Sequence, residues 1–117
     1  MNAEVVIFTK PNCEYCTRAK VLLASKRVRT VQIILDEQVS YSDARQVMVD
    51  LSHGATTVPQ IFINRKHIPG GFTGIYKLNH TGELDRLLVQ APPPEPFAEI
   101  AMFTKQSISV EVTDLDF

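Results

Sequence analysis

The sequence is poor in cysteine: only two occur among its 117 residues, and they lie three positions apart as Cys13 and Cys16. A pair this close would close too short a loop to stabilise a secreted domain, so a disulfide-rich scaffold is excluded. The expected compartment is therefore the cytoplasm, where thiols are kept reduced. In that setting a C-x-x-C pair indicates half of a metal site or a redox centre.

The sequence also lacks long hydrophobic runs and an excess of charge of either sign. No apolar stretch approaches the roughly 18 residues of a membrane span, and the N-terminus does not resemble a secretory signal. Charged residues make up 21% of the chain and the net charge is −1, which argues against a surface that binds nucleic acid or membrane. We therefore expect one compact domain with neither of these partners, monomeric when isolated.

Hydrophobic residues, 44% of the chain, instead form short segments with the periods of strands and helices. The run "EVVIFT" (4–9) is continuous and rich in β-branched residues, which predicts a strand buried on both faces. Residues 14–25 carry apolar side chains at i, i+3 and i+4, which predicts an amphipathic helix. The segment "RTVQIIL" (29–35) predicts a second strand. A strand, a helix and a strand in close order predict two parallel strands with a right-handed crossover.

The segments that follow, up to residue 90, add three helices and a hairpin. Ser42 is a plausible N-cap of the first of these helices, with Gly54 just beyond its end, and Thr81 is expected to cap the last. The predicted elements are a helix over 42–52, strands 60–63 and 66–68 joined as an antiparallel hairpin, a short helix over 73–78 and a final helix over 81–90.

The character of the chain changes at residue 91, where "APPPEPF" reads as a linker. Residues 1–90 hold 11 Lys and Arg against 8 Asp and Glu, whereas 91–117 hold 1 against 5. This tail contains an apolar patch (97–103) and a possible strand (108–112). We expect a domain over 1–90 and a Pro-rich, acidic tail over 91–117, either a solvated extension or the start of a further domain.

The two cysteines suit thiol–disulfide exchange, because Cys13 falls where the first helix begins. A thiol reacts as its thiolate, and the free N–H groups and positive dipole end of a helix N-terminus stabilise an anion. Lys10, Arg18 and Lys20 are near in sequence and add positive potential. Cys16, one turn into the helix, is expected to be more enclosed. The spacing therefore predicts that Cys13 attacks a disulfide and Cys16 resolves the mixed disulfide.

Two other interpretations of the cysteines are a structural zinc site and a pair of inert core thiols. A zinc site needs four ligands, and the sequence has no second C-x-x-C and no H-x-x-x-H. His53, His67 and His80 are scattered and read as ordinary surface or turn residues. Inert thiols would make the position at a strand–helix junction a coincidence. Redox chemistry is the favoured interpretation.

Four stretches, in this order, resemble the glutaredoxin family: "TKPNCEYC", "TVPQIFI" (57–63), "GGFTG" (70–74) and "GEL" (82–84). Together they span about residues 3–90. The resemblance implies an α/β, thioredoxin-like fold with a four-stranded mixed sheet flanked by helices. It also implies a glutathione-dependent oxidoreductase that reduces protein disulfides or glutathione mixed disulfides.

Site residues follow from the same resemblance. Cys13 and Cys16 would be the nucleophile and the resolving thiol. Lys10 would pair with the glycine carboxylate of glutathione, and Tyr15 would border the site. The remaining positions are Val58, whose backbone would bind the cysteinyl part of glutathione, and Pro59, whose peptide bond would be cis.

The "GGFTG" segment would form an anion site. Glycines such as Gly71 let a ligand approach the backbone, and the N–H groups of Phe72 and Thr73 at a helix start would hold the γ-glutamyl carboxylate. Thr73 could also serve as the N-cap of that helix.

The sequence departs from the family pattern at two positions. Glu14 replaces a proline between the cysteines, which places a negative charge beside the thiolate but also at the favourable end of the helix. Gly74 stands where the family often has an aspartate that contacts the amino group of glutathione. That change puts glutathione affinity in question and leaves room for another thiol donor.

The resemblance leaves a second class of function open, a module in which two subunits and two glutathiones hold a [2Fe–2S] cluster through the first cysteine. It also suggests ribonucleotide reductase, either as the protein that receives electrons or as a larger enzyme to which this domain is fused. The acidic end "TDLDF" loosely resembles peptides by which the small subunit of that enzyme docks on the large one.

Overall fold

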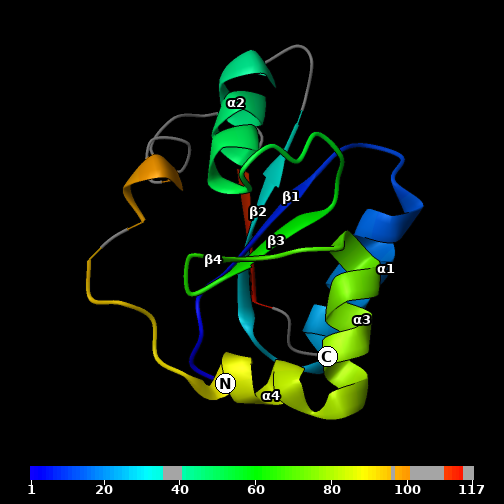
Figure 1. The fold of residues 1–117 in the computed structure, drawn as a ribbon, viewed down its shortest axis with the longest axis vertical. Helices are drawn as coiled ribbons and strands as arrows, with labels where there is room; N and C mark the ends of the chain where they lie inside the picture. Colours follow the sequence, from blue (N-terminus) through cyan, green and yellow to red (C-terminus); the bar gives the residue numbers. More distant parts are fainter. Residues whose placement is uncertain (36–40, 96, 101–109, 115–117) are drawn as a thin grey trace.

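A mixed five-stranded sheet lies at the centre of the computed structural model, which describes residues 1–35, 41–95, 97–100 and 110–114 (Figure 1). The strand order is β4-β3-β1-β2-β5, with β1 and β2 parallel and every other neighbouring pair antiparallel. The four-stranded mixed sheet is thus confirmed, with β5 added beside β2. The strands are β1 (Val5–Thr9), β2 (Arg29–Ile34), β3 (Gln60–Ile63), β4 (Lys66–Ile68) and β5 (Val110–Asp114).

The βαβ unit predicted from the first 35 residues is confirmed. Every residue of β1 is buried, because its two neighbours β2 and β3 and the helices on both faces cover it completely. Helix α1 (Glu14–Ser25) follows β1 and returns the chain to the parallel strand β2. The apolar side of α1, including Ala19 and Leu23, packs onto the sheet as its period requires.

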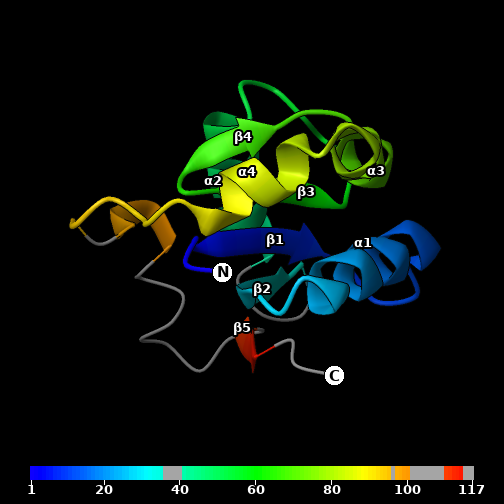
Figure 2. The same ribbon diagram turned by 90° about the horizontal axis from the view of Figure 1, so that it is seen from below.

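The helices divide between the two faces of the sheet. On one face lie α1, α3 (Gly71–Thr81) and α4 (Glu83–Val89), with α1 and α3 side by side (Figures 1 and 2). On the other face lies α2 (Tyr41–Leu51), whose Ala44 and Met48 pack against Phe8 and Phe62. Alternate residues of β1 therefore enter different cores, Val5 and Ile7 on the first face and Val6 and Phe8 on the second.

Part of the C-terminal tail packs on the domain that precedes it. Phe97 and Ile100 are buried in the core beneath α2, and the ring of Phe97 meets that of Phe62 edge to face at 6.5 Å. Strand β5 pairs with the outer edge of β2. The predicted apolar patch 97–103 is described only as far as residue 100, and residues 108–109 of the predicted strand and 115–117 of the acidic end lie outside the described residues.

Three predicted helix caps are wrong, because the helices begin at other residues. Helix α2 starts at Tyr41, so Ser42 is already inside it. Helix α3 starts at Gly71 and runs to Thr81, well beyond the predicted 73–78, so Thr73 is its third residue and the N-cap is Gly70. Left-handed glycines can end one helix and begin another, and Gly82 does so between α3 and α4 with a φ of 81°.

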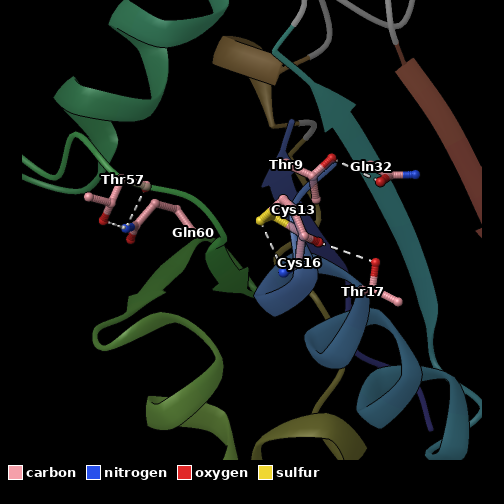
Figure 3. The surroundings of a disulfide bond; sticks show 7 residues. All are labelled: Thr9, Cys13, Cys16, Thr17, Gln32, Thr57 and Gln60. Carbon is pink, nitrogen blue, oxygen red and sulfur yellow. Dashed lines mark hydrogen bonds between the residues drawn. A yellow bond between two sulfur atoms is a disulfide. The ribbon is translucent and has the colours of Figure 1, made fainter. Parts of the chain in front are cut away.

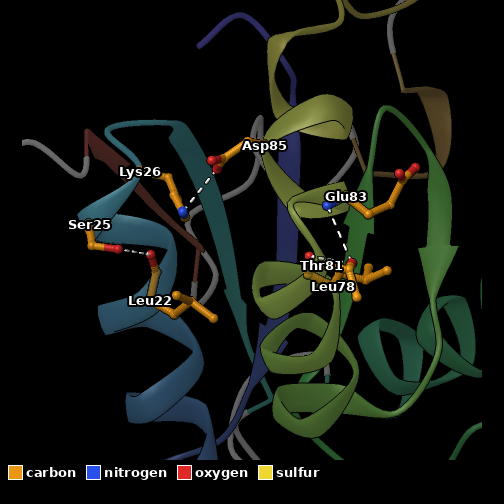
Figure 4. Close-up of polar contacts among 7 residues, drawn as sticks. All are labelled: Leu22, Ser25, Lys26, Leu78, Thr81, Glu83 and Asp85. Atoms are coloured by element: carbon orange, nitrogen blue, oxygen red, sulfur yellow. Dashed lines mark hydrogen bonds and ion pairs between the residues drawn. The ribbon is translucent and has the colours of Figure 1, made fainter.

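Thr81 is not the N-cap of α4, but its hydroxyl stabilises the junction between α3 and α4. This hydroxyl donates a hydrogen bond to the Leu78 carbonyl at 3.1 Å and accepts one from the Glu83 N–H at 3.4 Å (Figure 4). Across the same face, Lys26 Nζ at the end of α1 lies 2.9 Å from Asp85 Oδ1 of α4. These contacts tie α4 to both neighbouring helices.

Candidate active site

The two cysteines lie at the start of α1, directly after the loop that leaves β1. Cys13 is the N-cap, with extended backbone (φ −113°, ψ 107°), and its sulfur accepts a hydrogen bond from the Cys16 N–H at 3.2 Å (Figure 3). The two residues are joined in a disulfide, with their Cα atoms 5.2 Å apart. Cys13 is half-buried, whereas Cys16 is only 2% exposed. An incoming reactant therefore meets Cys13 first.

A groove of about 360 Å³ opens beside this pair, between α1, the loop before β3 and the start of α3. Six of the predicted site residues line it: Tyr15, Val58, Pro59, Gly71, Phe72 and Thr73. Three chain segments that are distant in sequence thus meet at one surface. The peptide bond between Val58 and Pro59 is cis, as the resemblance implied.

The predicted residue Lys10 does not line this groove. It lies with Cys13 and Cys16 in a second hollow of about 620 Å³, which Lys20 and Gln32 also line. At its floor the buried Thr9 hydroxyl donates to Gln32 Oε1 at 2.9 Å (Figure 3). The cysteine pair therefore stands between a groove with many backbone groups on one side and a hollow with two lysines on the other.

The start of α3 approaches the loop at the cis proline closely, and this contact requires a glycine. Gly71 has a φ of 56°, and a Cβ there would lie 3.1 Å from the Pro59 carbonyl oxygen. The first N–H groups of a helix have no partner within it, so those of Gly71, Phe72 and Thr73 are available at the groove. Such an array, at the positive end of the helix dipole, suits a carboxylate.

Gly74, the second departure from the family pattern, lies in a backbone that leaves no room for a side chain. A Cβ at this position would overlap the carbonyl oxygen of Pro69. An aspartate therefore does not fit this backbone, and Gly74 is fixed by the tight turn that precedes α3.

Aromatic side chains from α1 and α3 form one edge of the groove. The ring of Tyr15, which is 55% exposed, lies 6.3 Å from that of Phe72, and Phe72 in turn contacts Tyr76 at 5.6 Å. The Arg18 guanidinium stands 5.2 Å above the Tyr15 ring and binds Glu14 Oε1 at 2.6 Å. Arg18 thus offsets the charge that Glu14 brings next to the cysteines, although both side chains are well exposed and the pair is weak.

One polar pair was not predicted from the sequence: the buried Gln60, which lines the groove, and the half-buried His67 behind it. The amide nitrogen of Gln60 donates to the Thr57 carbonyl at 2.9 Å, and its oxygen lies 2.6 Å from His67 Nε2. Burial, followed by the charge of His53, lowers the pKa of His67. His67 is therefore not an ordinary surface histidine. The signal in the sequence was Gln60 itself, a polar residue at the start of the buried strand "QIFI".

The part of the chain that the structure describes contains no group of three or more His, Cys, Asp or Glu side chains placed to hold a metal ion. A [2Fe–2S] cluster shared by two subunits would use only Cys13 from each chain and would not need such a group. The cluster hypothesis therefore stays a prediction. Within the same residues, no helix is long and apolar enough to cross a membrane.

Comparison with known proteins identifies the family. The glutaredoxin family model matches residues 5–68. A probable glutaredoxin of Synechocystis sp. is 42% identical over 96 residues, which cover 82% of this chain and 83% of that protein. Glutaredoxin 3 of Escherichia coli is 46% identical over 86 residues, which cover 74% of this chain and 98% of that protein.

Solved structures agree with these sequence matches. The crystal structure of a buckwheat glutaredoxin–glutathione complex is 30% identical, with a TM-score of 0.65 over 73% of this chain and 76% of that one. The holo form of glutaredoxin C1 from Populus tremula x tremuloides is 33% identical, with a TM-score of 0.65 over 73% of this chain and 82% of that one. With its C-x-x-C pair at the start of α1 and its thioredoxin-like sheet, this chain belongs to the glutaredoxin family of thiol–disulfide oxidoreductases.

Proposed function

We propose that this protein reduces protein disulfides and glutathione mixed disulfides with glutathione as the electron donor. The observation that carries the proposal is the unequal pair of cysteines beside the groove. Cys13 is accessible at the N-terminus of α1, and Cys16 is buried within disulfide distance of it. Such a pair suits a nucleophile and a resolving thiol.

The groove supports glutathione as the partner. Glutathione is a short peptide with two carboxylates, and the backbone next to the cis proline and the N–H groups at the start of α3 offer it the complementary hydrogen bonds. Val58 would pair with its cysteinyl backbone and Phe72 and Thr73 with its γ-glutamyl carboxylate. Lys10 would reach its glycine carboxylate from the second hollow. The buckwheat glutaredoxin that was crystallised as a complex with glutathione has the same fold.

In reduction of a glutathionylated protein, the Cys13 thiolate attacks the glutathione sulfur. The S–S bond breaks, the protein leaves as a thiolate that takes up a proton, and glutathione stays joined to Cys13. A second glutathione then attacks the sulfur of the bound glutathione, which yields oxidised glutathione and restores the Cys13 thiolate.

In reduction of a protein disulfide, Cys13 forms the mixed disulfide with the substrate. Cys16 loses its proton and attacks the Cys13 sulfur, which releases the second substrate thiolate and leaves the Cys13–Cys16 disulfide. Two glutathiones then return the pair to the dithiol and become oxidised glutathione. Two electrons are transferred in each cycle.

The experiment compares Cys13→Ser and Cys16→Ser in an assay coupled to glutathione and glutathione reductase. We expect Cys13→Ser to abolish reduction of both substrate types. Cys16→Ser should still reduce a glutathionylated peptide but lose most turnover of a protein disulfide. Substantial activity of Cys13→Ser would overturn the assignment of roles. Efficient turnover by wild type with thioredoxin reductase, but none with glutathione, would overturn the choice of donor.

We further propose the cytoplasm as the site of the reaction and ribonucleotide reductase as a protein acceptor. The support comes from the sequence: few cysteines, the family resemblance and the acidic end "TDLDF". Because Phe97 and Ile100 belong to the core and residues 110–114 pair with β2, the informative truncation removes only residues 115–117. It should leave reduction of a model disulfide intact and weaken transfer to the reductase. Equal transfer would argue against docking through this tail.

A further inference from the structure

Gln60 and His67 form a connection between the groove and the outer strand of the sheet. Gln60 begins β3, directly after the cis proline, and His67 stands opposite Phe62 on β4. Gln60 and His67 are therefore diagonal neighbours on the same face of the hairpin. Gln60 is only 5% exposed, and the ring of His67 packs 5.2 Å from that of Phe62. The Gln60 side chain is thus buried, and His67 is half-buried against an aromatic ring.

The partners of Gln60 determine which way its amide points. The Thr57 carbonyl can only accept, so the end of the amide that lies 2.9 Å from it is the NH₂ group (Figure 3). The other end is then the oxygen, and the ring nitrogen 2.6 Å away must carry a proton. His67 Nε2–H thus donates to Gln60, and Gln60 donates to Thr57. Because burial and His53 lower the pKa of His67, its neutral form with one N–H is favoured.

This chain of two hydrogen bonds ends on the segment that lines the groove. Thr57, Val58 and Pro59 line it. Thr57 lies across from the cysteines (Figure 3). The Gln60 amide also lies 3.5 Å from the Thr57 hydroxyl, so both polar groups of Thr57 face it. His67 does not belong to the residues that line the groove. The hydrogen bond to Gln60 is the polar contact that connects His67 to the groove.

We propose that His67 and Gln60 are positioning residues for glutathione, which orient the Thr57–Pro59 segment so that the Val58 backbone can pair with the bound tripeptide. This inference rests on the proposed function, because it concerns how the same groove holds glutathione. The hydrogen bonds from His67 to Gln60 and from Gln60 to Thr57 do not include either cysteine. They affect substrate binding and not the exchange between the sulfurs.

The test uses three variants of the full chain. His67→Phe keeps an aromatic ring against Phe62 but removes the donor. His67→Gln restores an N–H donor on a side chain of similar reach. His80→Phe is the matched control, because His80 is exposed on α3 and its contact with Tyr76 is aromatic, which phenylalanine preserves.

Two activities are measured for each variant. One is steady-state reduction of a glutathionylated peptide, and the other is a single turnover in which the dithiol protein reduces a protein disulfide without glutathione. We expect His67→Phe to raise KM for the glutathionylated peptide about three- to tenfold, the worth of roughly one hydrogen bond, with kcat little changed. Its single-turnover rate should equal that of wild type. His67→Gln should recover most of the loss, and His80→Phe should show none.

An amide spectrum by NMR gives a readout that does not depend on turnover. The Val58 N–H resonance should shift in His67→Phe and return towards its wild-type position in His67→Gln. An unchanged KM in His67→Phe, or an equal loss in both activities, would overturn the proposal. If wild type itself failed to reduce the glutathionylated peptide with glutathione, the proposed function would fail instead, which separates the two outcomes.

Discussion

The backbone N–H of Cys16 donates a hydrogen bond to the sulfur of Cys13 at 3.2 Å. This N–H belongs to the first turn of α1, where it has no partner in the helix, and Cys13 is the more accessible of the two cysteines. Once the disulfide is reduced, an N–H donor and the positive end of the helix dipole at this position stabilise a thiolate on Cys13. Cys16, one turn later, is buried and receives neither benefit to the same degree. The chemical difference between two identical residues thus follows from their place in one turn of helix.

The first prediction concerns alkylation of the reduced protein. At pH 6 we expect iodoacetamide to modify Cys13 at least about tenfold faster than a cysteine in an unstructured peptide, because the helix N-terminus stabilises the reacting thiolate. Cys16 should react much more slowly. Mass spectrometry of the time course gives both rates, and Cys16→Ser isolates the first. A Cys13 rate equal to that of the peptide would contradict the electrostatic argument.

The second prediction concerns Gly74. Alanine stabilises a helix interior by about 1 kcal/mol relative to glycine. At Gly74, however, the added Cβ would overlap the Pro69 carbonyl, so we expect Gly74→Ala to lower the free energy of unfolding by about 1–3 kcal/mol. Urea denaturation measures the change. Lys77→Ala, at an exposed position of the same helix, should be nearly neutral. A higher free energy of unfolding for Gly74→Ala would show that the turn before α3 can move to accommodate the Cβ.

The same geometry makes a prediction for Gly74→Asp. This substitution restores the residue type that the family often has, yet the backbone cannot accept its Cβ without moving. We expect Gly74→Asp to lower the free energy of unfolding and to leave the KM for a glutathionylated peptide unchanged or higher. Tighter binding, measured by steady-state kinetics, would mean that the start of α3 adapts.

The third prediction concerns the packing of the tail. Phe97 is 7% exposed, and the Arg65 guanidinium lies 5.7 Å from its ring centroid on one side. Phe97→Ala should lower the free energy of unfolding by about 3 kcal/mol, because it opens a cavity in the core beneath α2. Phe97→Leu should cost less than half as much. Equal stability of Phe97→Ala and wild type in urea would mean that residues 97–100 do not contribute to the core.

The fourth prediction concerns pH and stability. The pKa of His67 in the folded protein lies below its ordinary value of 6.5, so the unfolded chain binds the proton more strongly. Stability should therefore fall as pH decreases below about 6.5, and the contribution of His67 is fully present only above that value. The difference in urea midpoint between pH 7 and pH 5 should be smaller in His67→Phe than in wild type. An identical difference would contradict the direction of the shift.

Local pattern was enough to predict most of the fold. The βαβ unit, the β3–β4 hairpin and the cysteine pair at a strand–helix junction were all predicted, because each depends on segments that follow one another directly in the sequence. The errors fell at helix ends. Thr73 and Thr81 are good capping residues, but left-handed glycines at Gly70 and Gly82 set the actual boundaries. Propensity identifies candidates for a cap, and the path of the chain selects among them.

Most residues that line the groove could be named from the family resemblance, but their arrangement could not be predicted. The resemblance supplied Tyr15, Val58 and Phe72, and the structure brings them to one groove. It did not indicate that Lys10 would line a different hollow, or that Gln60 would bond to His67. These facts depend on which strands pair and in which register.

The sequence by itself determined most of the helices and strands and the position of both cysteines at the start of a helix, because hydrophobic period and the start of a helix are properties of short segments. Tertiary structure alone decided that three distant segments form a groove beside Cys13, that Gln60 joins that groove to His67, and that Phe97 completes a core. Contacts of this kind depend on packing and strand register, which no local stretch of residues encodes.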